Sequence, residues 1–536
     1  FLLFSETLNR LHKMVDIGTR ILSLDKFEDI LFKEEKVALD KAAMEKVRAS
    51  HQFLKDFSTG KLIYGINTGF GPMAQYRVSE ENRVQLQYNL IRSHCSGMGA
   101  LMSPQMGKAV LVARLNSLMQ AHSGIHPSLV ELLAALINNN IIPCIYEHGG
   151  VGASGDLIQL AHVALALLGE GNVLFEGKTL PAAEILKKFN LKPLEIHIRE
   201  GLSILNGTSA MTGIGSLNLI FAKKLLHWSV VLSAMTNEVV EAYDDHFSRE
   251  LNIVKHHQGQ NLIATMLRHV LKGSKMIHSR SEHLYNPANI QHDVFEDKVQ
   301  EYYSLRCVTQ ILGPVYDTLK NAEKVIVDEL NSVNDNPVID HENKNIFHGG
   351  NFHGDYVSLE MDKIKIATTR VSMLAERQLN YLLNNNLNKI FPPFVNLGVL
   401  GLNFGMQGIQ FTAVSTVAEN QTLSFPMYVH SIPNNNDNQD IVSMGCNAAI
   451  MARKVIDNAF EVLAIQAVTI LQGIEYLSCQ EKLSPVTRTV YETIRKLFPK
   501  FVEDAPSYAE QEKVKQYLLQ NDPQFAFPAA DNPVSR

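Results

Sequence analysis

Long stretches of helical periodicity constrain the fold of this 536-residue chain more than any other feature. Between residues 355 and 385, apolar side chains recur three, four, seven or eight positions apart, at Val357, Met361, Ile364, Val371, Leu374 and Leu382. This spacing places them on one face of an α-helix. Residues 297–333 and 450–477 also have the pattern of long helices. The sequence therefore predicts a mainly α-helical protein, built as a bundle of long helices.

Polar loops separate the helical stretches, at 65–72, 149–155, 334–337, 349–354, 391–408 and 433–440. They are rich in Gly, Asn and Pro, which interrupt regular structure. Candidate strands are confined to 61–64 and 172–175. We expect functional loops carried by a rigid helical scaffold.

The tripeptide Ala153-Ser154-Gly155 lies in the most distinctive loop, between a glycine-rich lead-in and Asp156-Leu157. Three small residues leave the backbone almost free of side chains, and glycine tolerates unusual φ/ψ. We infer that the Gly155 nitrogen can attack the Ala153 carbonyl carbon and that Ser154 can then lose water to leave a methylidene group. The product is a five-membered, electron-poor ring, an electrophile that no ordinary side chain supplies.

Two other interpretations of this loop are open. Residues 150–155 fit the dinucleotide fingerprint G-x-G-x-x-G, which requires a preceding strand in a βαβ unit. Pro143 argues against a central strand before the loop, and no second Val/Ile-rich strand precedes Glu170 or Glu176. A plain glycine-rich lead-in to a helix is the other interpretation. We expect no bound NAD.

Composition excludes several classes of protein. Hydrophobic content of 46% and charged content of 19% are typical of a soluble globular protein. The net charge is −6 without a basic block, so we expect no nucleic-acid partner. No apolar run reaches the ~18 residues that a membrane helix needs, so we expect no membrane association. The five cysteines are scattered without C-x-x-C spacing, which favours a reduced, cytoplasmic protein.

We expect four regions along the chain. Residues 1–21 are interpreted as an extension or disordered start, because 13 residues precede Met14. Residues 22–215 form a loop-rich N-terminal part that carries the triplet. Residues 216–500 form the central bundle of long helices, and residues 501–536 form a C-terminal tail.

Tyr64 begins a loop that contains Gly65, Gly69 and Gly71. Such a loop can close over a substrate and bring the Tyr64 hydroxyl to it. A tyrosine, with an ordinary pKa near ~10, needs a nearby cation or helix N-terminus to act as a base near neutral pH. The alternative is a glycine-rich turn in which Tyr64 only packs.

Arg306 lies three residues after Tyr303, on the same helical face, and offers such a cation. Its planar guanidinium also suits a substrate carboxylate. The alternative is a surface arginine in a helix. Asn206, which precedes Gly207, either binds a small polar substrate or occupies a turn.

His94 follows Ser93 after the apolar run 84–91, so it either faces a cavity or is an interior histidine. Glu419 either faces a substrate or is an exposed helix carboxylate. Four further residues could suggest a metal site: His341, His348, His353 and Asp355. Their spacing matches no standard ligand motif, so we expect no metal.

Taken together, these residues resemble the aromatic amino acid ammonia-lyase family, which includes histidine, phenylalanine and tyrosine ammonia-lyases and related aminomutases. The likeness runs from about residue 22 to about residue 496. The matching segments are 64–71, 149–157, 206–208, 303–307, 334–337, 349–354 and 438–445. The resemblance implies a long-helix bundle of the fumarase/aspartase-like type and a homotetramer whose active sites take residues from three subunits. It also implies a 4-methylideneimidazol-5-one ring, formed autocatalytically from Ala153, Ser154 and Gly155.

The resemblance also implies roles for single residues. Tyr64 matches the catalytic tyrosine that takes the β-proton, and Arg306 matches the carboxylate clamp. Asn206 and Tyr303 match residues that hold and polarise the ring and the substrate amine. The remaining matches are to substrate-binding positions: Gln300 and Phe352 in the pocket, Glu419 at the acidic position, and Ser93 with His94 at the pair that reads the substrate side chain.

The substrate is less sharply specified. Ser93-His94 and residues 418–420 are similar to histidine ammonia-lyases, whereas 63–97, 241–247 and 428–445 look most like a bacterial tyrosine ammonia-lyase branch that shares the Ser-His pair. We predict deamination of L-tyrosine to trans-4-coumarate and ammonia, with L-histidine to urocanate as the alternative. Attack of the ring on the amine and attack on the aromatic carbon both stay open.

The variant Ser154→Ala tests the central inference. Only Ser154 can supply the methylidene carbon, so turnover should disappear while the protein stays folded. Steady-state activity and circular dichroism of the variant check this. Residual activity above roughly a thousandth of wild type, a loss of about 4 kcal/mol of transition-state stabilisation, would contradict the electrophile.

Overall fold

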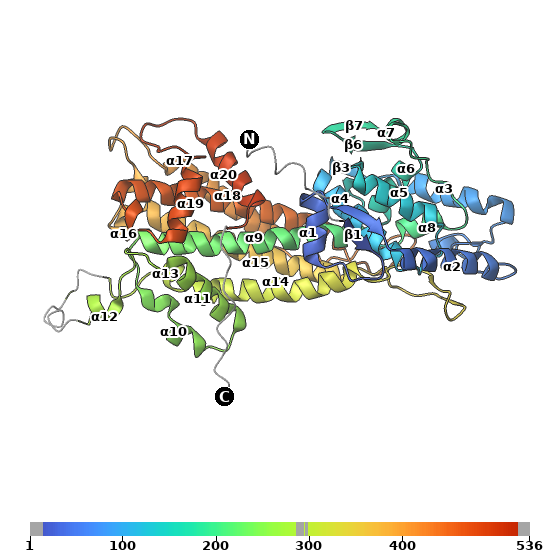
Figure 1. Cartoon of the computed structure of the whole chain (residues 1–536), viewed down its shortest axis with the longest axis horizontal. Helices are drawn as coiled ribbons and strands as arrows, with labels where there is room; N and C mark the ends of the chain where they lie inside the picture. Colours follow the sequence, from blue (N-terminus) through green and yellow to red (C-terminus); the bar gives the residue numbers. More distant parts are fainter. Residues whose placement is uncertain (1–13, 286–293, 295–297, 524–536) are drawn as a thin grey trace, which may run out of the picture. The chain divides into compact units, whose positions relative to one another are not determined.

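The computed structural model describes residues 14–285, 294 and 298–523 (Figure 1). The extension predicted for residues 1–13 lies outside them. Contacts divide the chain into two compact units. Unit 1 contains residues up to 220, 322–362 and 426–452, and unit 2 contains 221–321, 363–425 and the residues from 453 onward. The predicted division at 215 and 500 stays a prediction.

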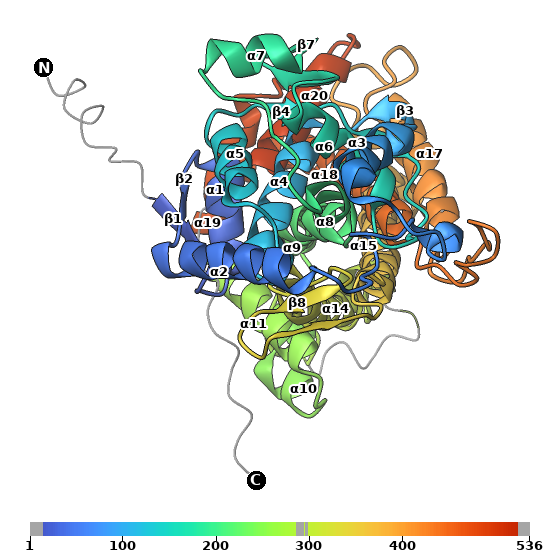
Figure 2. The same ribbon diagram turned by 90° about the vertical axis from the view of Figure 1, so that its right-hand side faces the viewer.

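Unit 1 combines short strands with helices (Figure 2). Its strands are β1 (Met14–Ile17), β2 (Lys36–Leu39), β3 (Met98–Leu101), β4 (Ile142–Pro143), β5 (Tyr146–His148), β6 (Asn172–Phe175), β7 (Lys178–Pro181), β8 (Val338–Asp340) and β9 (Asn345–Phe347). Its helices are α1 (Leu24–Phe32), α2 (Lys41–Phe57), α3 (Arg83–His94), α4 (Pro104–Met119), α5 (Pro127–Asn138), α6 (Leu157–Leu167), α7 (Ala182–Lys188) and α8 (Glu200–Leu205).

The strands form four small sheets. β1 pairs with β2 in parallel, whereas β3–β5, β4–β6–β7 and β8–β9 are antiparallel. The strand predicted at 172–175 is confirmed as β6. Because β5, the strand before the glycine-rich loop, belongs to an antiparallel pair, the loop does not begin a βαβ unit, and this argues against a dinucleotide site.

Helix α4 is the core of unit 1, and Figure 2 shows it among α2, α5 and α8. Every residue from Met106 to Met119 is buried. Ser103 begins the helix as its N-cap, accepting a hydrogen bond from the Met106 N–H, and Pro104 occupies the first turn. Because α4 is enclosed on all faces, its polar side chains must find partners inside the protein.

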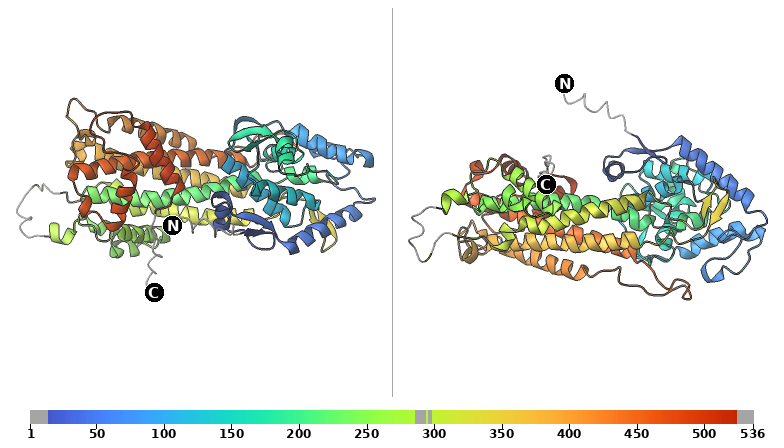
Figure 3. Two further views of the ribbon diagram at one scale, coloured as in Figure 1. Left: turned by 45° about the horizontal axis from the view of Figure 1, so that its top comes forward. Right: turned by 90° about the horizontal axis from the view of Figure 1, so that it is seen from below.

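Unit 2 is built on long helices that run side by side (Figures 1 and 3). Four helices contribute residues to both units: α9 (Ser209–Val239), α14 (Val308–Leu330), α15 (Asp355–Leu383) and α18 (Gly445–Leu477). The helices of unit 2 alone are α10 (Arg249–Ile253), α11 (Gln258–Leu271), α12 (Arg280–His283), α13 (Tyr303–Arg306), α16 (Asn385–Asn388), α17 (Gln407–Leu423), α19 (Pro485–Arg495) and α20 (Tyr508–Gln520).

The helices of unit 2 are joined by buried polar contacts as well as apolar ones. Gln466 on α18 donates to Gln378 on α15 and to Thr236 on α9. Trp228 on α9 donates to the carbonyl oxygens of Leu518 and Asn521, which fixes α20 against α9. These bonds satisfy groups that would otherwise be costly to bury.

The expectation about membrane helices needs correction. α9 and α18 each contain an 18-residue window with a mean hydropathy of 1.2 and 1.3, respectively, and both are long and apolar enough to cross a membrane. Single polar residues such as Thr236 and Gln466 interrupt the apolar runs without lowering the mean much. In each window 89% of the residues are buried within the protein, the position of a core helix.

Two predicted elements differ from the structure. Residues 61–64 form no strand, because the Asn67 side chain accepts from the Ile63 N–H and donates to the Lys61 carbonyl, closing a turn. The helix predicted over 297–333 is divided at Cys307 into α13 and α14. The helices predicted at 355–385 and 450–477 are confirmed as α15 and α18.

Replacement of Phe460 tests the core of unit 2. Phe460 on α18 is fully buried and meets Phe221 edge-on, with the ring centroids 6.5 Å apart. Phe460→Ala should lower the free energy of unfolding by about 3–5 kcal/mol, because it leaves a cavity. Denaturant unfolding checks this. Tyr508→Ala, at a side chain that is 77% exposed, is the control and should change stability little.

Candidate active site

The triplet lies in a tightly bent loop between β5 and α6. Ser154 has a left-handed backbone conformation, with φ of 57°, and it lies between Gly152 and Gly155, with φ of 82° and 81°. Gly152 and Gly155 pair across the bend as an isolated antiparallel bridge. A non-glycine residue at positive φ is uncommon and stores strain. The bent backbone fits closure of a ring between the Ala153 carbonyl carbon and the Gly155 nitrogen.

Gly207 holds the triplet from one side. Its N–H donates to the Ser154 carbonyl at 3.3 Å, and its carbonyl accepts from the Asp156 N–H at 2.8 Å. A Cβ added at Gly155 would lie 2.1 Å from the Gly207 oxygen. Position 155 therefore accepts only glycine, because any side chain would displace the Gly207 backbone.

Asp156 anchors the loop to the start of α9. Its carboxylate is completely buried and accepts from the Met211 N–H at 2.8 Å. Burial raises the pKa of Asp156 to about 7, although hydrogen bonds from the backbone of Met211 and Ala210 act to lower it. A titrating carboxyl thus lies directly beside the triplet, and this residue was not among the predicted site residues.

Asn206 ends α8 and is 3% exposed. Its backbone carbonyl accepts from the Arg114 guanidinium at 2.8 Å, whereas its side-chain oxygen is buried without a hydrogen-bond partner among the described residues. A buried amide oxygen without a partner is available to a ligand donor.

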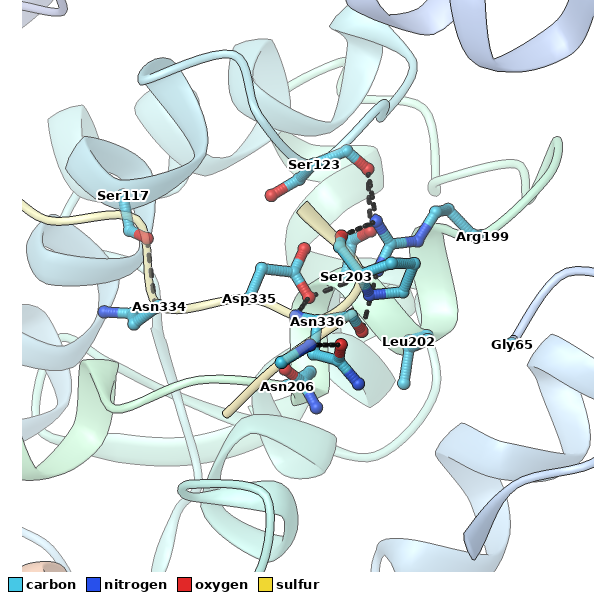
Figure 4. Close-up of polar contacts among 12 residues, drawn as sticks. Gly65, Ser117, Ser123, Arg199, Leu202, Ser203, Asn206, Asn334, Asp335 and Asn336 are labelled. Carbon is cyan, nitrogen blue, oxygen red and sulfur yellow. Dashed lines mark hydrogen bonds and ion pairs between the residues drawn. The ribbon is translucent and has the colours of Figure 1, made fainter. Parts of the chain in front are cut away.

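Figure 4 shows a second buried arginine, Arg199, with residues of the 334–337 loop. Arg199 is completely buried and pairs with Asp335 at 3.2 Å. It also donates to the carbonyl oxygens of Ser123, Pro337 and Asn336. The predicted polar loop 334–337 is therefore held rigidly by a fixed charge.

The Tyr64 loop is tied to α8. The Gly65 carbonyl accepts from the Gln87 side chain at 3.1 Å, and Gln87 accepts from the Leu202 N–H at 2.8 Å. The Tyr64 hydroxyl oxygen accepts from the Gly71 N–H at 3.1 Å. This bond orients the phenol oxygen within its own loop.

Gln439 lies next to the triplet and was missed at the sequence level. Its amide donates to the Ser154 hydroxyl at 3.4 Å. The turn that carries Gln439 also reaches the Tyr64 loop, because a Cβ at Gly71 would lie 2.6 Å from the Asn435 amide. The sequence signals were its place in the polar segment 433–440 and in the family-like segment 438–445, where several side chains are equally polar.

Ser93 and His94 end helix α3. His94 Nδ1 lies 2.9 Å from the Leu90 carbonyl oxygen and 3.1 Å from the Ser93 hydroxyl. A carbonyl oxygen can only accept, so Nδ1 carries the hydrogen and Nε2 is left as an acceptor. Burial lowers the pKa of His94, which favours this neutral form. Phe352 is half-buried in the loop before α15.

The remaining predicted residues lie in unit 2. Gln300, Tyr303 and Arg306 line a cavity of about 850 Å³. The Arg306 guanidinium lies over the Tyr303 ring, 4.9 Å from its centroid. Among the described residues Arg306 has no carboxylate partner, whereas Arg280 in the same cavity is paired with Asp245 at 2.6 Å. Arg306 is thus the cation available to an anionic ligand.

Glu419 is not in this cavity. It lies on α17, accepts from the Asn458 amide at 2.6 Å and is 3.7 Å from Lys454. These contacts are those of a surface helix carboxylate, so its part in substrate binding stays a prediction.

Two of the residues considered as metal ligands are close to each other, since His353 lies 3.5 Å from Asp355. Within the described ranges no group of three His, Cys, Asp or Glu residues could hold a metal ion.

The chain is similar to known proteins over most of its length. Residues 22–496 match the sequence model of the family described as aromatic amino acid lyase. Tyrosine ammonia-lyase of Cupriavidus metallidurans is 39% identical over 446 residues, covering 82% of this chain and 83% of the relative. Histidine ammonia-lyase of Shouchella clausii is 35% identical over 506 residues, covering 94% and 98%.

The fold is also similar to that of solved structures. The crystal structure of a tyrosine aminomutase from Streptomyces globisporus superposes with a TM-score of 0.92 and 34% identity, covering 96% of this chain and 100% of that one. The mainly α-helical fold class predicted from the sequence is thereby confirmed.

The raised pKa of Asp156 makes a testable prediction about pH. An unfolded Asp has a pKa near ~3.9, so folding takes up a proton between about pH 4 and 7. The stability that Asp156 contributes is complete below that window and is lost as the pH rises through it. Asp156→Asn removes this titration. As the pH rises through the window, the free energy of unfolding of wild type should therefore fall by up to ~1.36 kcal/mol per pH unit relative to that of the variant.

Urea unfolding of both proteins from about pH 4 to pH 8 measures the difference. Parallel stability profiles across the window would mean that Asp156 does not titrate there.

Proposed function

Because the chain belongs to the aromatic amino acid lyase family and is a carbon–nitrogen lyase, we propose that it converts L-tyrosine to trans-4-coumarate and ammonia. The observation that carries the choice of substrate is the hydrogen bond from His94 Nδ1 to the Leu90 carbonyl. It leaves Nε2 as an acceptor, so a matching substrate side chain must donate. The phenol of tyrosine donates, whereas the ring of phenylalanine does not.

The chemistry must overcome a poor leaving group and a weakly acidic β-hydrogen. Ala153, Ser154 and Gly155 would form the ring, an electrophile that would assist the loss of ammonia through either the amine or the aromatic carbon. The tight loop, with no room for a side chain at Gly155, supports its formation. Tyr64 takes the β-proton as general base. Asn206 and Tyr303 hold the amine.

Arg306 binds the substrate carboxylate. Its guanidinium has no competing carboxylate among the described residues, and its planar fork suits a two-pronged contact. Gln300 lines the same cavity, and Ser93, Phe352 and Glu419 complete the proposed set of substrate-binding residues.

Two other activities are the competing candidates. L-Histidine also carries a ring N–H donor for His94, and similarity to a histidine ammonia-lyase supports it. Similarity to a tyrosine aminomutase supports a 2,3-aminomutase, in which the released ammonia would add back at the β-carbon. Sequence identity does not separate the two activities on tyrosine, because the tyrosine ammonia-lyase is 39% identical over 446 residues and the aminomutase 38% over 475.

Product analysis separates these functions. Purified protein is incubated with tyrosine, histidine or phenylalanine, and the products are identified by chromatography and mass spectrometry. Free 4-coumarate and ammonia from tyrosine are expected. Urocanate as the faster product would support the histidine enzyme, and β-tyrosine as the main product would support the aminomutase. No turnover together with an unmodified protein mass would exclude the lyase altogether.

We also propose a cytoplasmic homotetramer with active sites shared between subunits, on the strength of the family resemblance. A mixing experiment tests the sharing. Inactive Tyr64→Phe and Arg306→Ala proteins are dissociated, mixed and reassembled. If Tyr64 and Arg306 of one site come from different subunits, the mixture regains activity, and if they come from one subunit, it stays inactive.

Selectivity at His94 gives a sharper prediction. His94 is half-buried, and an acceptor that a bound substrate covers without supplying a donor costs about 1–3 kcal/mol, so wild type should reject phenylalanine. His94→Phe removes that acceptor and adds apolar surface. The ratio of kcat/KM for phenylalanine over tyrosine should rise at least about tenfold, which corresponds to ~1.4 kcal/mol. Steady-state kinetics with both substrates measure it, and an unchanged ratio would assign the recognition of the phenol to another residue.

A further inference from the structure

Arg114 is a buried cation that the proposed mechanism does not use. It lies on α4, the enclosed core helix of unit 1, and its side chain is completely buried. Its Nη2 donates to the carbonyl oxygens of Ser203 and Asn206, and its Nη1 donates to Ser209 Oγ and Asn334 Oδ1, both at 3.2 Å. All four acceptors are uncharged.

These contacts enclose the turn between α8 and α9. Ser203 and Asn206 lie before Gly207 in the chain, and Ser209 lies after it, so one guanidinium group binds the turn at both ends. Gly207 comes so close to Arg114 that a Cβ there would lie 2.5 Å from Nη1. The absence of a side chain at Gly207 is what allows this contact.

The 203–209 turn also contacts the triplet. Gly207 donates to the Ser154 carbonyl and accepts from the Asp156 N–H, and it also forms a parallel bridge with Gly155. A continuous path of close contacts therefore runs from the Arg114 guanidinium through the Gly207 backbone to the Ser154 carbonyl and the Asp156 N–H, on the two sides of Gly155.

The charge of Arg114 persists despite its burial. Desolvation lowers its pKa to about 10, while the carboxylates of Asp335 and Asp156 act to raise it, so the group is protonated at neutral pH. A buried cation without a direct ion pair is costly, and the cost is offset only by well-formed hydrogen bonds. This cost favours the one local geometry that supplies all four acceptors, which are two backbone carbonyl oxygens and two side-chain oxygens.

We propose that Arg114 is the positioning residue for ring formation, holding the 203–209 turn in the geometry that keeps the triplet bent for cyclisation. The inference rests on the proposed function. In the step that it promotes, the Gly155 nitrogen bonds to the Ala153 carbonyl carbon. The Ala153 oxygen leaves as water with the hydrogens of the Gly155 and Ser154 amides. Ser154 then loses its hydroxyl and its α-hydrogen as a second water, so the reaction needs no oxidant.

The test follows the mass of the protein rather than its activity. Wild type, Arg114→Gln and Arg114→Lys are sampled over time after a short pulse of synthesis, and intact-mass spectrometry gives the fraction that has lost two waters. Arg114→Gln should lose water at least about tenfold more slowly than wild type, a factor that corresponds to ~1.4 kcal/mol. Arg114→Lys keeps the charge but not the two-pronged reach, and should lie between them.

Arg199→Lys is the matched control. Arg199 is also completely buried in unit 1, but its side chain bonds to residues 123 and 335–337, and only its backbone carbonyl, which the Lys variant keeps, bonds to Ser203 in the 203–209 turn. The Arg199→Lys variant should have a melting temperature lowered about as much as that of Arg114→Lys, yet it should lose both waters at the wild-type rate. Equal slowing in Arg199→Lys would mean that general destabilisation, rather than positioning, is the cause.

Different results would overturn the proposed function and the role of Arg114. Wild type with no loss of water would overturn the proposed function itself. Wild type that loses two waters, together with a folded Arg114→Gln that does so equally fast, would overturn only the role of Arg114. If Arg114→Gln does not accumulate as folded protein, Arg114→Lys takes its place as the test variant. Loss of both waters at the wild-type rate in Arg114→Lys would then overturn the role of Arg114.

Discussion

The contact between the backbones of Gly155 and Gly207 is the constraint on which the rest of the site depends. The two residues are 52 positions apart in sequence, yet there is no room for a methyl group between them. Both have positive φ, at 81° and 138°. Because two glycines are needed to bring the chains this close, the loop after β5 and the turn after α8 form one structure rather than two neighbouring ones.

Buried polar groups fix this structure in place. Arg114 and Arg199 satisfy backbone carbonyls of the loops on which the candidate site is built, and Asp156 satisfies the first turn of α9. Apolar packing alone would tolerate small shifts of these loops, whereas a buried charge tolerates few alternatives to its hydrogen bonds. The core of unit 1 thus contributes specificity of geometry as well as stability.

Local patterns explain what could be predicted from the sequence. The periodicity of residues 355–385 is a property of one segment, and so is the small size of the side chains in Ala153-Ser154-Gly155. Gln439 and Arg114 could not be found in this way, because their contacts join residues 285 and up to 220 positions apart. The wrongly predicted strand at 61–64 failed for a related reason, since a single asparagine side chain took the hydrogen bonds that a neighbouring strand would have made.

The left-handed conformation of Ser154 has a consequence for the life of the protein in the cell. Such a residue costs of order 1–3 kcal/mol, so the loop adopts this shape only when the surrounding structure imposes it. The imposing residues come from α4, the turn after α8 and the segment before α18, and Gln439 in the last of these is synthesised 285 residues after Ser154. On the proposed chemistry, a nascent or misfolded chain therefore carries an inert Ala-Ser-Gly sequence. The reactive electrophile arises only after folding is complete, which protects other cellular nucleophiles from it.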